Sequence, residues 1–161
     1  TLQAIRVRPI QPEDQSRVEK LIIDHWGSAG MVIRGEVLYP AELPGFLALS
    51  DDEICGLVTY IIRGKACEIT SLDAFQSGLG IGSALVEAVK QEARAKGCTR
   101  LHLVTTNDNI NALAFYQKRG FRLAELRPGA IEHSRKIKPE IPLLAENGIP
   151  IRDEIELEMD L

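Results

Sequence analysis

The feature that most constrains this chain is a run of alternating glycines at the point where the sequence periodicity changes. Residues 66–75 have the pattern of a β-strand, whereas apolar residues in 81–93 recur at the spacing of one helix face. Between these two segments, Gly78, Gly80 and Gly82 occupy alternate positions. The pattern predicts a strand, a tight glycine loop and a helix that begins at the loop.

The rest of the chain predicts one α/β domain over residues 1–161, with a mixed, mostly antiparallel sheet and helices on both faces, in three layers. Hydrophobic periodicity and turn residues predict strands at 4–8, 46–49, 54–62, 66–75, 101–105, 121–126 and 151–160, and helices at 12–26, 81–93 and 109–119. Two long segments rich in glycine and proline, 27–45 and 128–150, are predicted as loops, the first as a loop or a broken helix.

Net charge, hydropathy and cysteine spacing argue against several classes of protein and site. A net charge of −4 argues against a nucleic-acid partner, which normally meets a basic face. No apolar stretch is long enough for a membrane span, and the first ten residues lack the apolar region of a signal peptide. Three cysteines, Cys55, Cys67 and Cys98, are too widely spaced for a CxxC site and are expected to be small buried hydrophobes. We therefore expect a cytoplasmic protein.

The glycine loop is suited to an anion. Backbone amides at the start of a helix lack partners within the helix, and glycines let an anion approach them closely. A pyrophosphate fits this arrangement, and a tight turn without a ligand is the alternative. The spacing differs from the dinucleotide-binding G-x-G-x-x-G, and there is no Gly-Lys-Ser/Thr of a nucleotide-triphosphate loop.

Two motifs make the chain resemble the GNAT superfamily of N-acetyltransferases over residues 66–126. The run Leu-Asp-Ala-Phe-Gln-Ser-Gly-Leu-Gly-Ile-Gly at 72–82 resembles the family's V-x-P-x-x-R/Q-G-x-G-I/V-G. The run Asn-Ile-Asn-Ala-Leu-Ala-Phe-Tyr-Gln-Lys-Arg-Gly-Phe at 109–121 resembles its N-x-x-A-(I/L)-x-(L/F)-Y-x-K-x-G-F. Ser77 stands where the family usually has Arg or Gln, and Ala74 replaces the usual Pro.

The resemblance implies an enzyme that transfers the acetyl group of acetyl-CoA directly to a primary amine, without a metal. It implies that acetyl-CoA contacts the end of the strand, the glycine loop and the second motif. The expected contact residues are Leu72, Asp73, Ala74, Ser77, Gly78, Leu79, Gly80, Ile81, Gly82, Ser83, Asn109, Tyr116 and Lys118.

Within the second motif, the resemblance makes Tyr116 the general acid that protonates the departing thiolate; a core tyrosine is the alternative. Asn109 is equally consistent with a helix N-cap and with a contact to the pantetheine arm. Lys118 is a candidate for a nucleotide phosphate, or an ordinary solvated lysine.

The sequence does not single out a general base. The candidates are Glu68 and Asp73 on the predicted strand, and Glu36, Glu132 and His133 in the two long loops. His25 is expected to be buried on the apolar face of its helix, and His102 to be structural. No group of His, Cys, Asp and Glu has the spacing of metal ligands.

The acceptor is expected to contact the loops at 27–45 and 128–150, and to be a small molecule or a peptide amine. The charged run 132–138 is either a short exposed helix with solvated charges or a pocket wall for a carboxylate-bearing amine. A silent CoA-binding module and a transferase of longer acyl groups remain alternatives. The oligomeric state is left open, with a homodimer as one alternative that only family habit suggests.

Overall fold

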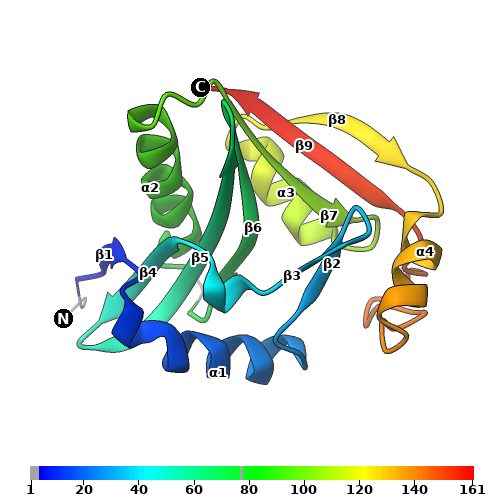
Figure 1. Cartoon of the computed structure of the whole chain (residues 1–161), viewed down its shortest axis with the longest axis horizontal. Coiled ribbons are helices and arrows are strands. Elements are labelled where there is room, and N and C mark those ends of the chain that lie inside the picture. The colour runs from blue at the N-terminus through cyan, green and yellow to red at the C-terminus, as the bar shows by residue number, and fades with distance from the viewer. Residues whose placement is uncertain (1–3, 77) are drawn as a thin grey trace. The chain divides into compact units, whose positions relative to one another are not determined.

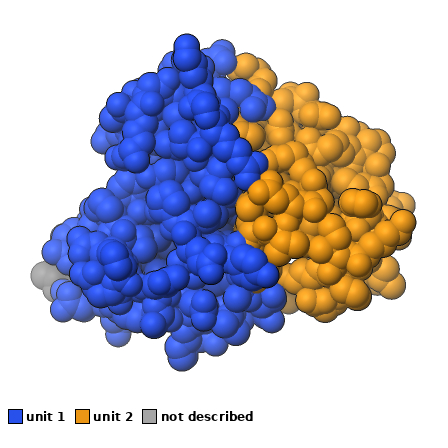
Figure 2. All heavy atoms as spheres, viewed as in Figure 1, with its two compact units in different colours: residues 1–29, 39–101, 160–161 blue, residues 30–38, 102–159 orange. Residues whose placement is uncertain are grey.

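The computed structural model describes residues 4–76 and 78–161, which form two compact units (Figures 1 and 2). Unit 1 contains the described residues through Ala29, then 39–101 and 160–161. Unit 2 contains residues 30–38 and 102–159. The expectation of one domain over the whole chain stays a prediction, and each unit is described by itself.

Four antiparallel strands form the sheet of unit 1, in the order β1-β4-β5-β6. They are β1 (Arg6–Pro9), β4 (Gly45–Ser50), β5 (Glu53–Arg63) and β6 (Ala66–Ala74). The register of β5 against β6 shifts between Thr59 and Tyr60, and beyond the shift Leu57 lies opposite Asp73. The predicted antiparallel meander over residues 46–75 is therefore confirmed.

Two α-helices cover opposite faces of this sheet (Figure 1). Successive side chains of a strand point to opposite faces. Leu57 of β5 joins a buried cluster with Val18 and Ile22 of α1 (Gln15–Trp26). A side chain at the preceding position, Gly56, would instead meet α2 (Ile81–Ala95). The expected three layers of helix, sheet and helix are thus present within unit 1.

Short 3-10 turns complete unit 1. The turn η1 (Pro12–Asp14) leads into α1, and η2 (Pro40–Glu42) contacts that helix. Asp14 is buried at the junction, where its carboxylate accepts hydrogen bonds from the Gln11 amide at 2.8 Å and from both terminal nitrogens of Arg8 at 2.6 and 2.9 Å. The Arg8 guanidinium lowers the pKa of Asp14 to about 2.

The larger sheet of unit 2 has its strands in the order β7-β9-β8, and helices α3 and α4 belong to the same unit. The elements are β7 (Arg100–Thr106), which begins at the boundary of the two units, α3 (Ile110–Lys118), β8 (Arg122–Arg127), α4 (Ala130–Ile137) and β9 (Glu154–Asp160). Strands β8 and β9 pair antiparallel. The α/β class and the mostly antiparallel sheet are as predicted.

The segment predicted as a loop or broken helix at 27–45 instead contains a β-hairpin. Strands β2 (Met31–Ile33) and β3 (Glu36–Leu38) pair antiparallel around a two-residue turn. Arg34 and Gly35 both have positive φ, 51° and 74°, as a type I′ hairpin turn requires. The sequence did not reveal this turn because Arg is an unusual residue for its first position.

Candidate functional site

The glycine loop joins β6 to the N-terminus of α2, as the sequence predicted. Gly78 and Gly80 have φ of 79° and 68°, and Gly80 is the N-cap of the helix. A Cβ added to either glycine would meet no atom within 4 Å, so the space beside this backbone is open. An open backbone at a helix N-terminus is the arrangement that accepts a phosphate group.

Close packing against β5 positions the loop. A Cβ at Gly56 would overlap the Ile81 side chain and lie 3.0 Å from Leu85. The missing side chain lets the first turn of α2 rest directly on the strand, and Ile81 is buried there. The N-terminus of α2 is thereby held at the end of β6 by apolar contacts.

The other predicted contact residues of unit 1 flank the loop. Leu72, Asp73 and Ala74 form the last three positions of β6, and Gly82 and Ser83 lie in the first turn of α2. Leu79 is exposed in the loop, whereas the buried Ile81 side chain can offer a ligand only its backbone. Ser77 lies outside the described residues.

The three predicted contact residues of the second motif lie in unit 2. Tyr116 is buried in α3, where its ring makes edge-to-face contacts with Phe115 and Phe121 at centroid distances of 5.1 and 5.4 Å. These contacts fix the orientation of its ring. Lys118 is exposed in the last turn of the helix.

Asn109 is the N-cap of α3. Its side-chain oxygen Oδ1 accepts a hydrogen bond from the Ala112 backbone amide at 3.4 Å, and its side-chain nitrogen Nδ2 donates to the Thr105 hydroxyl at 3.2 Å. The capping role is confirmed, and the pantetheine contact stays a prediction.

The Asp73 side chain, at the end of β6, has a hydrogen-bond partner that the sequence did not suggest. The Trp26 indole N–H donates a hydrogen bond of 3.0 Å to Oδ2 of Asp73. The preceding helix residue, His25, stacks on Phe75 with a centroid distance of 4.4 Å. The expectation that His25 is buried is wrong, because its position near the C-terminus of α1 leaves it exposed over the strand end. The sequence signal that could have pointed to the contact with Asp73 is the single tryptophan of the chain, which stands at the end of a predicted helix.

The charged run at 132–138 forms most of α4, and its charges are only partly solvated. Arg135 donates to the carbonyl oxygens of Ile141, Pro142 and Ile151 at 3.3, 2.7 and 2.7 Å. Lys138 donates to the Gly30 carbonyl at 2.9 Å. The short helix is confirmed, but these two cations hold neighbouring backbone segments and are not simply solvated.

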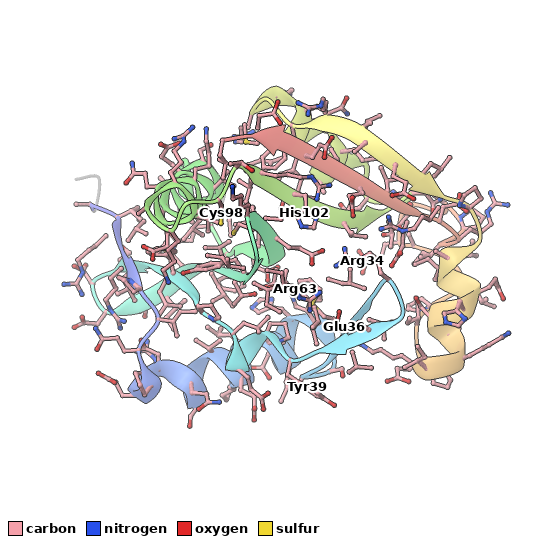
Figure 3. All side chains as sticks on the ribbon, turned by 45° about the horizontal axis from the view of Figure 1, so that its top comes forward. Arg34, Glu36, Tyr39, Arg63, Cys98 and His102 are labelled. Carbon is pink, nitrogen blue, oxygen red and sulfur yellow. The ribbon has the colours of Figure 1, made fainter. Side chains whose placement is uncertain are left out.

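Carboxylates on β9 fix the β2–β3 hairpin within unit 2. Arg34, at the hairpin turn (Figure 3), donates its backbone amide to Glu154 at 3.1 Å and places its guanidinium 3.5 Å from Glu156. Arg127 contacts the same two carboxylates at 3.2 and 3.6 Å. His102 lies with Nδ1 at 3.8 Å from Glu156, which agrees with its expected structural role.

Comparison with known proteins identifies the family. Residues 7–121 match the model of the acetyltransferase (GNAT) family, which is well over half of the chain. This chain belongs to the GNAT family of acetyltransferases. The match extends the resemblance from the two motifs back to the first strand and helix.

Relatives and solved structures agree with this membership. The chain is 53% identical to Bacillus subtilis (strain 168) protein YxbD, covering 85% of this chain and 87% of that one. It is 30% identical to the uncharacterized N-acetyltransferase YvbK of the same organism, covering 72% and 74%. A GNAT acetyltransferase from Elizabethkingia anophelis with acetyl-CoA bound is similar with a TM-score of 0.69 at 25% identity, covering 98% of both chains. GNAT membership supports an acyltransferase that uses a coenzyme A thioester.

Other features of the described residues add no competing centre to this GNAT protein. No group of three or more His, Cys, Asp and Glu within 4–76 and 78–161 is placed to hold a metal. The three cysteines are buried, and burial raises the pKa of Cys67 to about 12, so its thiol is a poor nucleophile. No helix in the described part of the chain has both the length and the apolarity to cross a bilayer.

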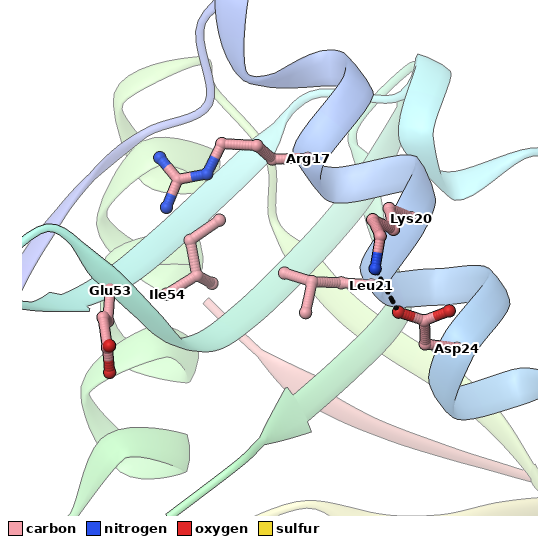
Figure 4. A pocket seen from close by; sticks show the side chains of 6 residues that line it. All are labelled: Arg17, Lys20, Leu21, Asp24, Glu53 and Ile54. Carbon is pink, nitrogen blue, oxygen red and sulfur yellow. Dashed lines mark hydrogen bonds and ion pairs between the residues drawn. The ribbon is translucent and has the colours of Figure 1, made fainter.

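A surface hollow of about 330 Å³ lies between α1 and the start of β5 (Figure 4). It is lined by Arg17, Lys20, Leu21, Asp24, Glu53 and Ile54. Lys20 and Asp24 form an ion pair of 3.1 Å within it, and both side chains are well exposed. None of the predicted site residues lines this hollow.

Proposed function

We propose that this GNAT protein is an N-acetyltransferase that passes the acetyl group of acetyl-CoA directly to a primary amine. The observation that carries the proposal is the open glycine backbone at the start of α2, with Gly78 and Gly80 in left-handed conformations and free space beside both. The acetyl-CoA in the similar Elizabethkingia anophelis structure supports the choice of cosubstrate.

The described residues suit a pyrophosphate ester. Each open glycine leaves space that a side chain would fill, and the positive end of the α2 dipole favours an anion at this position. We assign the pyrophosphate to the backbone of residues 78–83 and the acyl end to the backbone of Leu72, Asp73 and Ala74. Ser77, Asn109 and Lys118 remain proposed contacts on the strength of the family motif.

The reaction forms a bond between the amine nitrogen and the thioester carbonyl carbon and breaks the bond from that carbon to sulfur. The amine must lose a proton, and the departing thiolate must gain one. We propose Tyr116 as the donor of the second proton, because a phenol can donate one and its packing between two phenylalanines fixes its direction. A backbone amide of the β6 end directed at the carbonyl would support the oxyanion, an effect worth roughly 3 kcal/mol per donor.

The first test measures coenzyme A affinity by titration calorimetry in two matched variants. Gly80 and Gly129 are both helix N-caps with positive φ, 68° and 72°, and both have open space beside them. Alanine at either position carries a similar backbone strain of about 1–2 kcal/mol. We expect Gly80→Ala to weaken coenzyme A binding at least tenfold and Gly129→Ala to leave it unchanged. Equal affinities in both variants would remove the loop from the binding site.

The second test measures thiol release from acetyl-CoA across a panel of amines. Tyr116→Phe should slow amine-dependent release by about 100-fold, the usual scale for one proton-transfer group. Tyr60→Phe, which removes a buried hydroxyl from unit 1, is the matched control and should retain the rate. Coenzyme A binding without release for any amine would identify a silent binding module. Faster release from longer acyl donors would identify a different acyltransferase.

A further inference from the structure

The side chain of Asp73 lies on the α1 face of the unit 1 sheet. Residues directly opposite each other in an antiparallel pair project to the same face. Asp73 lies opposite Leu57, and Leu57 packs in the buried cluster with Val18 and Ile22 of α1. The α2 helix, which begins at the glycine loop, covers the other face. The carboxylate is therefore separated by the sheet from the face that carries the proposed phosphate-binding helix.

Aromatic groups of α1 and of the residue directly after β6 lie near this carboxylate. Trp26 donates its indole N–H to Oδ2 at 3.0 Å, which orients the carboxylate. His25 lies stacked on Phe75, two residues along the chain from Asp73. Trp26 is 43% exposed and Asp73 is half-buried, so the carboxylate is partly shielded from water and still open to a solute.

The other carboxylate candidates are less suited to proton transfer. Glu68 is 2% exposed and thus inaccessible to an acceptor. Glu132 forms an ion pair of 2.9 Å with Arg135, and Glu36 is exposed on the β2–β3 hairpin. A solvated carboxylate is a weak base near neutral pH. His133 is exposed on α4.

The surroundings of Asp73 act on its pKa in opposite directions. Burial raises the pKa of Asp73, which strengthens it as a base, whereas the Trp26 hydrogen bond and the charge of His25 lower it, with burial prevailing. From β5 the opposing residue is Leu57, and the neighbouring residue of β6 on the same face is Ser71. Neither titrates, and from α1 the titratable group whose charge acts on Asp73 is His25.

We infer that the Asp73 carboxylate is the base that takes the proton from the acceptor amine, and that Trp26 positions this carboxylate. The inference rests on the proposed function, because it names a group for that reaction. A proton leaves the amine nitrogen for a carboxylate oxygen of Asp73, and the nitrogen lone pair forms the bond to the thioester carbon. The carbon–sulfur bond then breaks and the thiolate takes a proton from the Tyr116 hydroxyl, the donor proposed above, so that charge and atoms balance.

The experiment compares pH profiles of kcat/KM for the best amine of the panel in the chain of residues 1–161. Asp73→Asn keeps an oxygen that can accept the Trp26 hydrogen bond, so it removes the base with little change of shape. We expect about a 100-fold loss of kcat, with acetyl-CoA affinity by calorimetry within about twofold of the wild type. Asp24→Asn makes the same chemical change on α1 at an exposed ion pair and should leave the profile unchanged.

Trp26→Phe tests the positioning role through the pH profile. Removing the indole donor raises the pKa of Asp73 further, since that hydrogen bond favours the charged form. Activity requires the ionised carboxylate, so the acid limb of kcat/KM should move to higher pH in this variant. A tryptophan with a purely structural role would lower stability without moving the limb.

An acceptor with a low pKa provides a further discriminating measurement. An arylamine is already neutral at pH 7, so the loss in Asp73→Asn should be much smaller for it than for an alkylamine. If the wild type acetylates amines and Asp73→Asn keeps both rate and profile, the assignment of Asp73 is wrong while the proposed function stands. If the wild type releases no thiol with any amine, the proposed function fails and the assignment fails with it.

Discussion

The two units of this protein hold their elements together by different interactions. In unit 1, α2 rests on β5 through apolar contact, where Gly56 makes room for Ile81 and Leu85. In unit 2, the β2–β3 hairpin is fixed by buried carboxylates, with Glu154 bonded to the Arg34 amide and to Arg127.

This difference explains why the sequence predicted the packing contacts of unit 1 better than the ionic contacts that hold the hairpin and α4 in unit 2. Apolar contact is non-directional and repeats with the period of the helix or strand, so it leaves a pattern along the chain. A charged group that bonds a carbonyl or a carboxylate depends on where distant segments meet, and its residue looks like any surface charge. Arg135, which holds three carbonyl oxygens, is indistinguishable in the sequence from its solvated neighbour Lys136.

The largest effect is expected from breaking the ionic network of unit 2. Glu154 is 2% exposed, and Glu154→Ala would remove the buried one of the two carboxylates that lie 3.2 Å from the Arg127 guanidinium, the other being Glu125. Removing one partner of a buried ion pair costs about 3–5 kcal/mol, and the lower end applies because Arg127 is partly exposed. Urea unfolding measures the loss. The double variant Glu154→Leu with Arg127→Leu should regain part of it, and a loss below about 1 kcal/mol in Glu154→Ala would contradict the importance of the network.

The apolar contact of unit 1 should be less costly to disturb. Gly56→Ala places a methyl group against Ile81, and overpacking of this kind costs about 1–3 kcal/mol. Because the displaced element carries the glycine loop, coenzyme A affinity should fall together with the midpoint of urea unfolding. Gly64→Asn is the control, since that turn has free space and asparagine tolerates its left-handed conformation. Unchanged coenzyme A affinity in Gly56→Ala would show that the loop does not depend on this contact.

The smallest effect is expected from the ion pair of Asp14 with Arg8, an ionic contact in unit 1. Asp14→Asn removes a charge bonded to Arg8 and to the Gln11 amide, and should cost about 1–2 kcal/mol at pH 7. The pKa of Asp14 falls from its ordinary 3.8 to about 2 in the folded protein. A lowered carboxylate pKa stabilises the fold fully above pH 4, and this contribution disappears as the pH falls through about 2. The free energies of unfolding of the two proteins should therefore converge in acid, and a constant difference from pH 7 to pH 2 would contradict the cause given for the shift.

The parts of the candidate site that the sequence predicted are those that follow from local pattern. The glycine spacing predicted a tight loop and a helix that starts at its end, at Ile81, whereas the left-handed backbone of Gly78 and Gly80 was seen only in the structure. The Asn109 cap followed from its place before a helix. The contact of Trp26 with Asp73 joins residues 47 positions apart, and no local pattern encodes such a pair.

The sequence by itself determined the α/β class, most helices and strands of both units and the family motifs, because alternation, helical spacing and glycine placement act over a few neighbouring residues. Tertiary structure alone decided which carboxylate lies among aromatic side chains, which arginines hold backbone carbonyls and that residues 31–38 form a hairpin. These outcomes depend on groups brought together from distant parts of the chain. Their energies come from burial and from the direction of each hydrogen bond, and neither exists until the chain has folded.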